Sequence, residues 1–253
     1  MADILRELNP QQKKAVAAST GPVLVLAGPG SGKTRVLTYR IAYLIAAMGI
    51  PPYQIMAVTF TNKAAREMET RVTDLLGGQM DGLWLGTFHA ICGRILRREA
   101  AHLPINNNFV IYDQDDQLSL VRRVIKEKKI NNKDYRPHQV LDKISSAKND
   151  LITPDEFPIL TFRDEMIKEI YQAYQSYLVK SNAVDFDDML LYAAHLLAEN
   201  SEVRNKYAKR FQHILVDEFQ DTNRAQYVLL HHLASYHRNL FVVGDEDQSI
   251  YRW

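Results

Sequence analysis

The sequence predicts an α/β fold, in which a parallel-sheet domain carries an inserted, all-helical subdomain. Three observations support this prediction. Strand-like apolar runs alternate with helix-like segments in the first third of the chain and return near its end. Between about residues 113 and 182, apolar side chains recur only at helical spacing. A glycine-rich loop joins the first apolar run to a helix-like segment. We therefore expect residues 1–112 and 185–253 to form the sheet domain and residues 113–184 to form the insertion.

Capping residues and apolar runs define the elements of the first third. Asn9 as an N-cap and Pro10 at the first helical position predict a helix that ends at about Ser19. The continuous apolar run 23–27 predicts a strand that is buried on both faces. The other elements expected here are helices over 33–48, from Asn62 to the glycines 77–78, and after Thr87, with strands over 55–60 and 83–86.

Helical periodicity dominates the middle of the chain. Two apolar stripes at helical spacing are formed by Leu118, Val121, Val124 and Ile125, and by Ile167, Ile170, Tyr171, Tyr174 and Leu178. Strands are expected again over 213–217 and 240–244, where apolar runs return. Helices inserted between strands of one parallel sheet fit a subdomain rather than a separate fold.

Composition excludes several classes of protein. The chain has 253 residues and a formal net charge of +1, so any nucleic-acid site must be a local patch. The single cysteine, Cys92, excludes an intrachain disulfide and a cysteine-rich zinc site. The apolar runs are too short to span a bilayer, and the first residues lack the pattern of a signal peptide. We therefore expect a cytoplasmic protein.

The glycine-rich loop has the features of a phosphate-binding loop. It consists of Ala27, Gly28, Pro29, Gly30, Ser31, Gly32, Lys33 and Thr34, between a strand and a helix. The glycines let backbone N–H groups turn toward phosphate oxygens, and the helix N-terminus adds a partial positive charge. Lys33 is expected to neutralise phosphate charge and Thr34 to supply a hydroxyl ligand for Mg²⁺. Ala27 stands where such loops usually begin with glycine.

A pair of carboxylates follows the apolar run 213–216. In open α/β sheets, ligands bind at the carboxyl ends of the strands, so Asp217 and Glu218 are placed to complement the phosphate loop. Asp217 is expected to hold Mg²⁺, and Glu218 to orient and deprotonate an attacking water molecule. The two motifs together predict ATP and Mg²⁺ as cofactors.

Six further segments carry a family resemblance. They are LNPQQ at 8–12, VTFTNKAA at 58–65, GTFH at 86–89, DFDDML at 185–190, DEFQDTN at 217–223 and VGDEDQSIYRW at 243–253. In this order they resemble the motifs of the UvrD/Rep/PcrA group of superfamily-one DNA helicases. The resemblance implies a RecA-like P-loop NTPase motor domain (domain 1A, the sheet domain) with an inserted helical subdomain (1B). It extends from about residue 8 to residue 253.

The resemblance also implies roles for individual residues. Gln12 matches the glutamine that reads adenine, Arg35 flanks the nucleotide, and Gln248 senses the γ-phosphate and completes the catalytic set. Stacking on aromatic faces tolerates any base, which suits a motor that moves along arbitrary DNA. The residues implied in DNA binding are Phe60, Thr61, Asn62, Thr87, His89, Phe186, Tyr251 and Trp253.

Partners and direction follow from the same resemblance. It implies an ATP-dependent helicase or translocase that binds single-stranded DNA and junctions of single- and double-stranded DNA, moving 3′ to 5′. The family's second motor domain, which supplies arginines to the γ-phosphate, is expected to be absent from this chain. Such arginines contribute about 10³–10⁵ in rate. We therefore expect the chain alone to bind ATP and DNA, but to hydrolyse ATP poorly and not to unwind DNA.

Other interpretations stay open at the level of sequence. A solvated helix position is an equal alternative for Arg35. The basic group in the insertion, Lys126, Lys128, Lys129, Lys133 and Arg136, fits a solvated helix end as well as a contact with duplex DNA. The motor of a helicase–nuclease would carry similar motifs. A module that binds nucleotide and DNA without hydrolysis is a third possibility, against which the intact catalytic residues argue.

Overall fold

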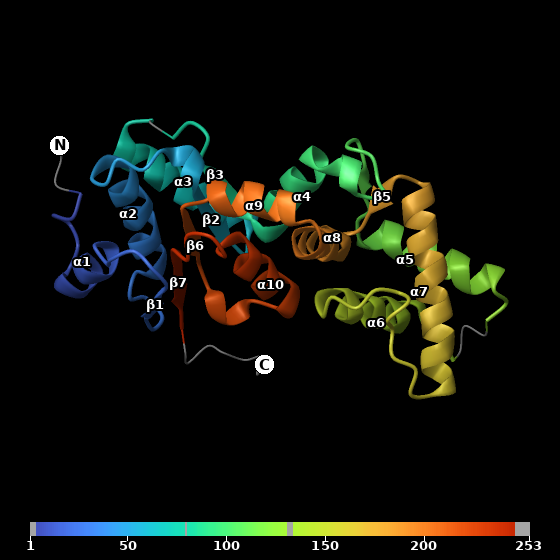
Figure 1. The fold of residues 1–253 in the computed structure, drawn as a ribbon. Helices are drawn as coiled ribbons and strands as arrows, with labels where there is room; N and C mark the ends of the chain where they lie inside the picture. The colour runs from blue at the N-terminus through green and yellow to red at the C-terminus, as the bar shows by residue number, and fades with distance from the viewer. Residues whose placement is uncertain (1–3, 79, 131–133, 246–253) are drawn as a thin grey trace. The chain divides into compact units, whose positions relative to one another are not determined.

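A computed structural model of the protein describes residues 4–78, 80–130 and 134–245. The chain divides into two compact units, which are coloured along the sequence in Figure 1. The sheet unit comprises residues 1–91, 200–222 and 230–253, and the helical unit comprises residues 92–199 and 223–229. The α/β class with a parallel sheet and many helices is confirmed.

The sheet unit is built on a five-stranded parallel sheet with the order β1-β7-β6-β2-β3. Its strands are β1 (Val23–Leu26), β2 (Ile55–Thr59), β3 (Trp84–Thr87), β6 (His213–Val216) and β7 (Leu240–Gly244). Because β7 pairs with β1 and β6 pairs with β2, the two strands from the end of the chain lie between strands from its first third. All five strands therefore present their carboxyl ends at one edge of the sheet.

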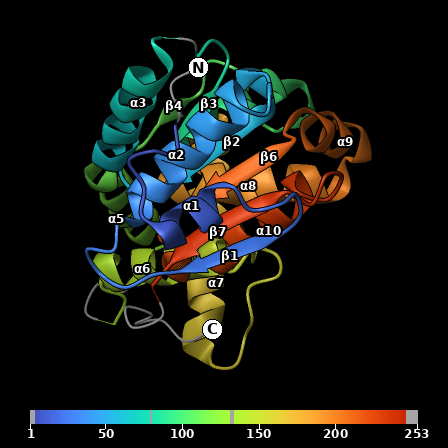
Figure 2. The same cartoon turned by 90° about the vertical axis from the view of Figure 1, so that its left-hand side faces the viewer.

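Helices that flank the strands in the sequence cover both faces of this sheet. They are α1 (Pro10–Val16), α2 (Lys33–Ala46), α3 (Asn62–Leu76) and α9 (Ser201–Arg210), with the short helices η1 (Pro52–Gln54) and η3 (Phe219–Asp221). Figure 2 shows α2 lying in front of the sheet. Apolar side chains of α2 and α3, such as Leu37 and Met68, pack with Ala57 and Leu215 of the sheet. Helix α1 begins as predicted, with Asn9 as its cap, but ends three residues short of Ser19.

The prediction that the first strand is buried on both faces is wrong. Val23 and Val25 pack against the core, but Leu24 and Leu26 are 59% and 55% exposed. Among the described strands, β1 lies at an edge of the sheet and pairs only with β7. Successive side chains of a strand point to opposite faces, so an edge strand with one exposed face alternates between buried and exposed positions, although its sequence is apolar throughout.

The helical unit has its own apolar core. Its helices are α5 (Gln114–Glu127), α6 (Pro137–Asn149), α7 (Phe162–Lys180) and α8 (Phe186–Glu199), with the short helix η2 (Ala100–His102). The two predicted stripes, on α5 and α7, lie in this core, except for Leu118, which is buried outside it. Two-residue strands β4 (Val110–Ile111) and β5 (Ala183–Val184) pair beside it, which the sequence did not predict.

The helical unit is wider than the predicted insertion of 113–184. It includes the second half of α4 (Phe88–Arg98), all of α8 and the first part of α10 (Arg224–Leu233). The physical reason is packing: a Cβ at Gly93 of α4 would lie 3.5 Å from the Met189 sulfur of α8, and α8 contacts α6. The boundaries at 113 and 184 stay a prediction for the subdomain itself.

A buried ion network ties the helical unit together. Lys148 of α6 is fully buried, and its Nζ lies 2.6 Å from Asp185 Oδ2 and 2.7 Å from Asp188 Oδ1. Tyr174 of α7 donates its hydroxyl to Asp185 Oδ2 at 2.9 Å. Burial disfavours the charged ammonium, but the carboxylates of Asp185 and Asp188 outweigh it and raise the pKa of Lys148. The Lys148 ammonium and the Asp185 carboxylate therefore link α6, α7 and the start of α8.

Replacing Lys148 with methionine is expected to destabilise the protein by about 3–5 kcal/mol, because two buried carboxylates lose their counter-charge. Urea denaturation followed by circular dichroism measures this change. Lys143→Met, at an exposed position of the same helix, is the matched control and should change stability by less than about 0.5 kcal/mol. Equal effects from both substitutions would contradict the importance of the network.

Candidate functional site

The candidate site begins with the loop between β1 and α2. Gly30 and Gly32 have φ of 72° and 89°, a left-handed backbone that favours glycine. The loop closes on itself because Ser31 Oγ donates to the Gly28 carbonyl at 2.6 Å. The Ala27 N–H donates to the Gly244 carbonyl at 3.0 Å, which extends the pairing of β1 with β7 past the end of the strand. The loop therefore curls directly into the N-terminus of α2, where Lys33 is the first helical residue.

Two carboxylates from the end of β6 meet the start of α2. Thr34 Oγ1 donates to Asp217 Oδ2 at 3.2 Å, although the two residues lie 183 positions apart in the sequence. Lys33 Nζ lies 3.3 Å from Glu218 Oε2. The sheet order explains the meeting, because β6 and β1 flank β7 and all three strands end at the same edge. The four residues that the two sequence motifs contributed are thus brought together.

A third carboxylate, missed at the sequence level, completes the surroundings of Lys33. Asp245 follows β7, is almost fully buried, and its Oδ2 lies 3.1 Å from Lys33 Nζ. Burial opposes the charge of Lys33, but its hydrogen bond to Asp245 and its pairing with Glu218 raise its pKa. A signal for Asp245 was present: it follows an apolar run in the same way as Asp217, and parallel strands end at one edge.

The pair Thr34 and Asp217 fits a Mg²⁺ ion. Magnesium prefers oxygen ligands in octahedral geometry at about 2.0–2.1 Å, and often keeps several waters. Burial raises the pKa of Asp217, and repulsion from Glu218 adds to the effect, so a bound cation would stabilise the ionised carboxylate. Within residues 4–78, 80–130 and 134–245, no group of three or more His, Cys, Asp or Glu side chains is placed to hold a metal. A hydroxyl, one carboxylate and phosphate oxygens make the more fitting ligand set.

Glu218 has an unusual backbone conformation. Its φ and ψ are 46° and 48°, in the left-handed region, which costs a non-glycine residue about 1–2 kcal/mol. Such strain persists where the surroundings hold the backbone, and it is concentrated at functional sites. Gln220 supplies one such restraint, since its Nε2 donates to Glu218 Oε2 at 2.7 Å. Sequence reasoning assigned no role to Gln220.

Gln12 lies against the phosphate loop. It closes the capping box of α1 with Asn9, and its Nε2 donates to the Ser31 carbonyl at 3.1 Å. A Cβ at Gly32 would lie 2.8 Å from that nitrogen. The structure therefore places the predicted adenine-reading residue at the loop, and a glycine at position 32 makes the approach possible.

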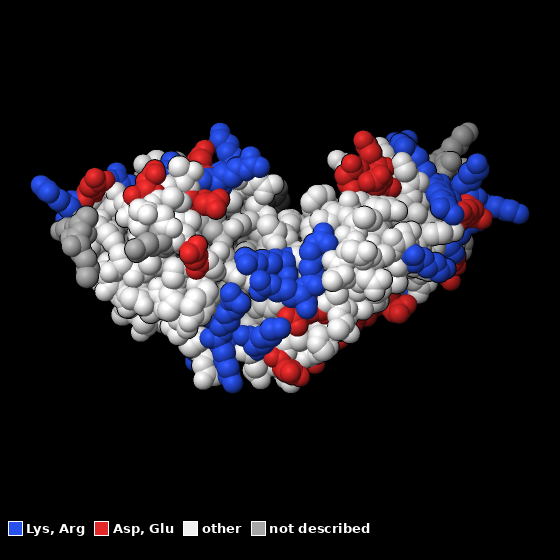
Figure 3. Space-filling view, turned by 90° about the horizontal axis from the view of Figure 1, so that it is seen from above, with Lys and Arg blue, Asp and Glu red and all other residues white. Residues whose placement is uncertain are grey.

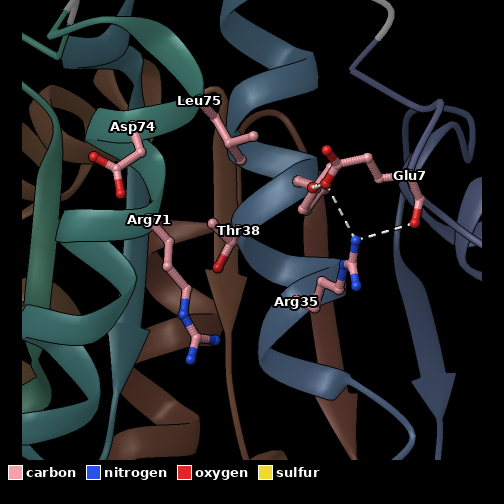
Figure 4. A pocket seen from close by; sticks show the side chains of 7 residues that line it. Glu7, Arg35, Thr38, Arg71, Asp74 and Leu75 are labelled. Atoms are coloured by element: carbon pink, nitrogen blue, oxygen red, sulfur yellow. Dashed lines mark hydrogen bonds and ion pairs between the residues drawn. The ribbon is translucent and has the colours of Figure 1, made fainter.

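Arg35 points away from the loop in this structure. Its guanidinium donates to the Glu7 carbonyl at 3.0 Å and lies 3.4 Å from the Glu7 carboxylate. Figure 4 shows this contact at the rim of a pocket of about 450 Å³, lined by Glu7, Arg35, Thr38, Tyr39, Arg71, Asp74 and Leu75. The pocket lies beside α2 and α3 and shares only Arg35 with the predicted nucleotide site.

The predicted DNA-binding residues of the sheet unit follow two neighbouring strands. Phe60, Thr61 and Asn62 come after β2, while Thr87 and His89 lie at and beyond the end of β3, which pairs with β2. Phe60 is partly buried and packs edge-on against Phe88, with ring centroids 5.6 Å apart. The five predicted residues therefore share one edge of the sheet.

Both threonines at this edge also cap helices. Thr61 Oγ1 accepts from the Ala64 N–H at 3.1 Å, and Thr87 Oγ1 accepts from the Ala90 N–H at 3.2 Å. Each hydroxyl hydrogen still can donate to a phosphate oxygen.

The remaining predicted residues do not join this group. Phe186 is half-exposed at the start of α8, in the helical unit. Gln248, Tyr251 and Trp253 lie outside the described residues.

The structure describes the surroundings of only some of the basic residues predicted in the helical unit. Lys126 is exposed at the end of α5, and Lys128 pairs with Glu169 of α7 at 3.0 Å. Arg136 is the N-cap residue of α6, and Lys133 lies outside the described residues. Figure 3 shows Lys and Arg side chains together with Asp and Glu on one face of the molecule. Part of the predicted basic patch is therefore neutralised within the protein.

Comparison with known proteins gives a consistent result. The family model described as UvrD/REP helicase N-terminal domain matches residues 8–253. The chain is 49% identical over 252 residues to the ATP-dependent DNA helicase PcrA of Bacillus subtilis, covering 99% of this chain and 34% of that protein. It is 46% identical to PcrA of Staphylococcus aureus (strain Mu50), and 45% to PcrA of Staphylococcus epidermidis, each time over 100% of this chain and 35% of the relative.

Proposed function

The chain belongs to the UvrD/REP helicase family, and on this premise we propose that it is the front part of an ATP-driven DNA motor. It binds MgATP and single-stranded DNA, and couples ATP hydrolysis to movement on DNA and to unwinding of the duplex. The chain spans about a third of the length of the PcrA relatives. The activity of the whole helicase is therefore part of the proposal.

One observation carries the nucleotide half of the proposal. The phosphate loop and the β6 carboxylates converge, with Thr34 Oγ1 3.2 Å from Asp217 Oδ2 and Lys33 Nζ 3.3 Å from Glu218 Oε2. A hydroxyl, a lysine and two acidic side chains at a helix N-terminus form the arrangement that phosphoryl transfer requires. Alternatives such as a helicase–nuclease motor share this arrangement, and a non-hydrolysing module would not need Glu218 as a base.

Each residue then has a defined task in phosphoryl transfer. Backbone N–H groups of the loop glycines, Gly28, Gly30 and Gly32, bind phosphate oxygens, and Lys33 neutralises their charge. Thr34 and Asp217 would hold Mg²⁺, which would supply positive charge beside the phosphate oxygens. Glu218 orients water and accepts its proton. Gln12 recognises adenine, Arg35 flanks the base after leaving Glu7, and Gln248 senses the γ-phosphate.

DNA is proposed to lie along the edge formed by the ends of β2 and β3. Thr61, Asn62, Thr87 and His89 bond the phosphate backbone, which gives affinity without sequence preference. Phe60, together with Phe186, Tyr251 and Trp253, supplies aromatic faces for stacking. The helical subdomain, residues 113–184, contacts the duplex at a junction of single- and double-stranded DNA.

The direction of movement on DNA and the contribution of a second motor domain are also part of the proposal. Movement is 3′ to 5′ by analogy with the family, and a second motor domain supplies the arginines that complete the site. Among the described residues no helix has the length and apolar character to cross a membrane, and a cytoplasmic location is proposed.

Dependence of ATP binding on Mg²⁺ tests the nucleotide half of the proposal. Calorimetric titration with a non-hydrolysable ATP analogue should show binding that EDTA weakens by at least about 10-fold, equivalent to 1.4 kcal/mol. Asp217→Asn should reduce this Mg²⁺ dependence, whereas Asp74→Asn, in the pocket of Figure 4, should leave it unchanged. Analogue binding that ignores both EDTA and Asp217→Asn would refute the assigned metal site.

Phe60→Leu tests the DNA half. Leucine keeps the packing on Phe88 but removes the aromatic face, so single-stranded DNA should bind about 5- to 100-fold more weakly, as expected for the loss of one stacked base. Fluorescence anisotropy with a labelled oligonucleotide measures the change. Tyr236→Leu removes an exposed aromatic ring that precedes β7, at the opposite edge of the sheet. If both variants bind DNA like the wild type, the proposed track is wrong.

A further inference from the structure

Gln220 occupies a position between two segments of the nucleotide site. It is the middle residue of η3, which follows Glu218 directly. Its side-chain Nε2 donates to Glu218 Oε2 at 2.7 Å, and its Oε1 accepts from the Asp245 N–H at 3.0 Å. One amide group therefore joins the carboxylate that follows β6 to the backbone that follows β7.

The packing at the end of β7 leaves room for this contact. A Cβ added to Gly244 would lie only 3.0 Å from Gln220 Oε1 and 3.7 Å from the Gln220 backbone nitrogen. Glycine at position 244 thus permits the close approach of the amide. The same strand end carries Asp245, whose carboxylate pairs with Lys33.

The contacts close a ring around Lys33. Lys33 Nζ reaches both Glu218 Oε2 and Asp245 Oδ2, while Gln220 joins Glu218 to the Asp245 backbone. Lys33 is expected to turn toward phosphate oxygens when ATP binds, which weakens its hold on Glu218. Gln220 then remains as the restraint on that carboxylate.

Glu218 needs such a restraint for two reasons. Its backbone is in the left-handed region, which the chain would leave if nothing held it. Its side chain is 36% exposed, so burial alone does not fix its rotamer. Lys33 and Gln220 both contact Oε2, so Oε1 is the oxygen that can accept from a water molecule.

We propose that Gln220 is a positioning residue for ATP hydrolysis: it holds Oε2 of Glu218 so that Oε1 meets the attacking water, and it ties this orientation to the end of β7. This inference rests on the proposed ATPase function. An amide is required because it must donate at one end and accept at the other. A carboxylate in its place would keep the acceptor but repel Glu218.

Two variants and one control test the proposal in the full-length protein. Gln220→Leu should lower kcat for ATP by about 10- to 100-fold, the usual effect of a misplaced catalytic group, with KM changed less than about three-fold. Gln220→Glu should lower kcat at least as far. Gln212→Leu, immediately before β6, should retain wild-type kcat.

Amide hydrogen exchange gives a second readout that does not depend on turnover. The Asp245 N–H should exchange at least about 10-fold faster in Gln220→Leu, because its acceptor is lost, and stay protected in Gln220→Glu. Unchanged Asp245 protection in Gln220→Leu, or a rise in KM with unchanged kcat, would overturn the proposal. Failure of the wild type to hydrolyse ATP in a Lys33-dependent manner would instead refute the proposed function, and the exchange data would still decide whether Gln220 restrains Asp245.

Discussion

Lys33→Ala is expected to weaken MgATP binding by about 100-fold, because charge-assisted bonds to phosphate are each worth about 1.5–3 kcal/mol. A second effect adds to this loss of affinity, because Lys33 also balances the charge of two carboxylates. Lys33 Nζ pairs with the carboxylates of Glu218 and Asp245, at 3.3 and 3.1 Å. Without its charge, both carboxylates repel the phosphates. Turnover in the full-length protein should fall to the level of a sample without protein.

Calorimetric titration with MgATP measures the binding term, and release of inorganic phosphate measures turnover. Lys14→Ala removes an exposed lysine from α1 and is the matched control, expected to bind like the wild type. Tight MgATP binding by Lys33→Ala would mean that the loop between β1 and α2 does not hold the phosphates.

Glu218→Gln should lower the rate of ATP hydrolysis with little change in the affinity for MgATP. The amide is isosteric with the carboxylate but cannot accept a proton from water, so kcat should fall by about 10²–10⁴-fold, the usual contribution of a general base. MgATP affinity should change less than about three-fold, because Lys33, Thr34 and Asp217 are untouched.

Single-turnover hydrolysis in the full-length protein measures this effect. Glu202→Gln, on the first turn of α9, removes a carboxylate elsewhere in the sheet unit and should hydrolyse ATP normally. A Glu218→Gln variant with wild-type kcat would show that another group activates the water, and the assignment would pass to a different residue.

Local rules made much of the fold predictable. Asn9 and Pro10 start α1 because cap chemistry acts over three residues, and the structure shows the full capping box with Gln12. The glycines of the loop predicted a left-handed backbone, which Gly30 and Gly32 adopt. The convergence of Lys33 and Thr34 on Asp217 and Glu218 followed from one rule, that parallel strands end at the same edge.

Long-range order was harder to predict. Nothing in the run 23–27 shows whether a strand is central or at an edge, and so the burial of Leu24 and Leu26 was predicted wrongly. The placement of β7 between β1 and β6 brings Asp245 to Lys33, but strand order is a property of the whole sheet. Lys148 and its partners Asp185 and Asp188 are 37 and 40 positions apart, and a lysine in sequence looks solvated.

The backbone of Glu218 illustrates why functional residues are harder to predict from sequence than regular strands and helices. A regular strand or helix reflects propensities that single residues carry. Glu218 adopts φ of 46° against its own propensity, and its side chain contacts Gln220 and Lys33. The contact with Lys33 is not visible in the sequence, since it depends on the order of distant strands.

The most direct test of this account is ATP turnover by the present chain alone, with and without single-stranded DNA, beside Lys33→Ala. The account predicts MgATP binding that depends on Lys33, with turnover close to the Lys33→Ala background in both conditions, because the arginines of a second motor domain are needed for rapid hydrolysis. Binding that persists without Lys33 would contradict the nucleotide site. Strong, Lys33-dependent turnover stimulated by DNA would contradict the role given to the second motor domain.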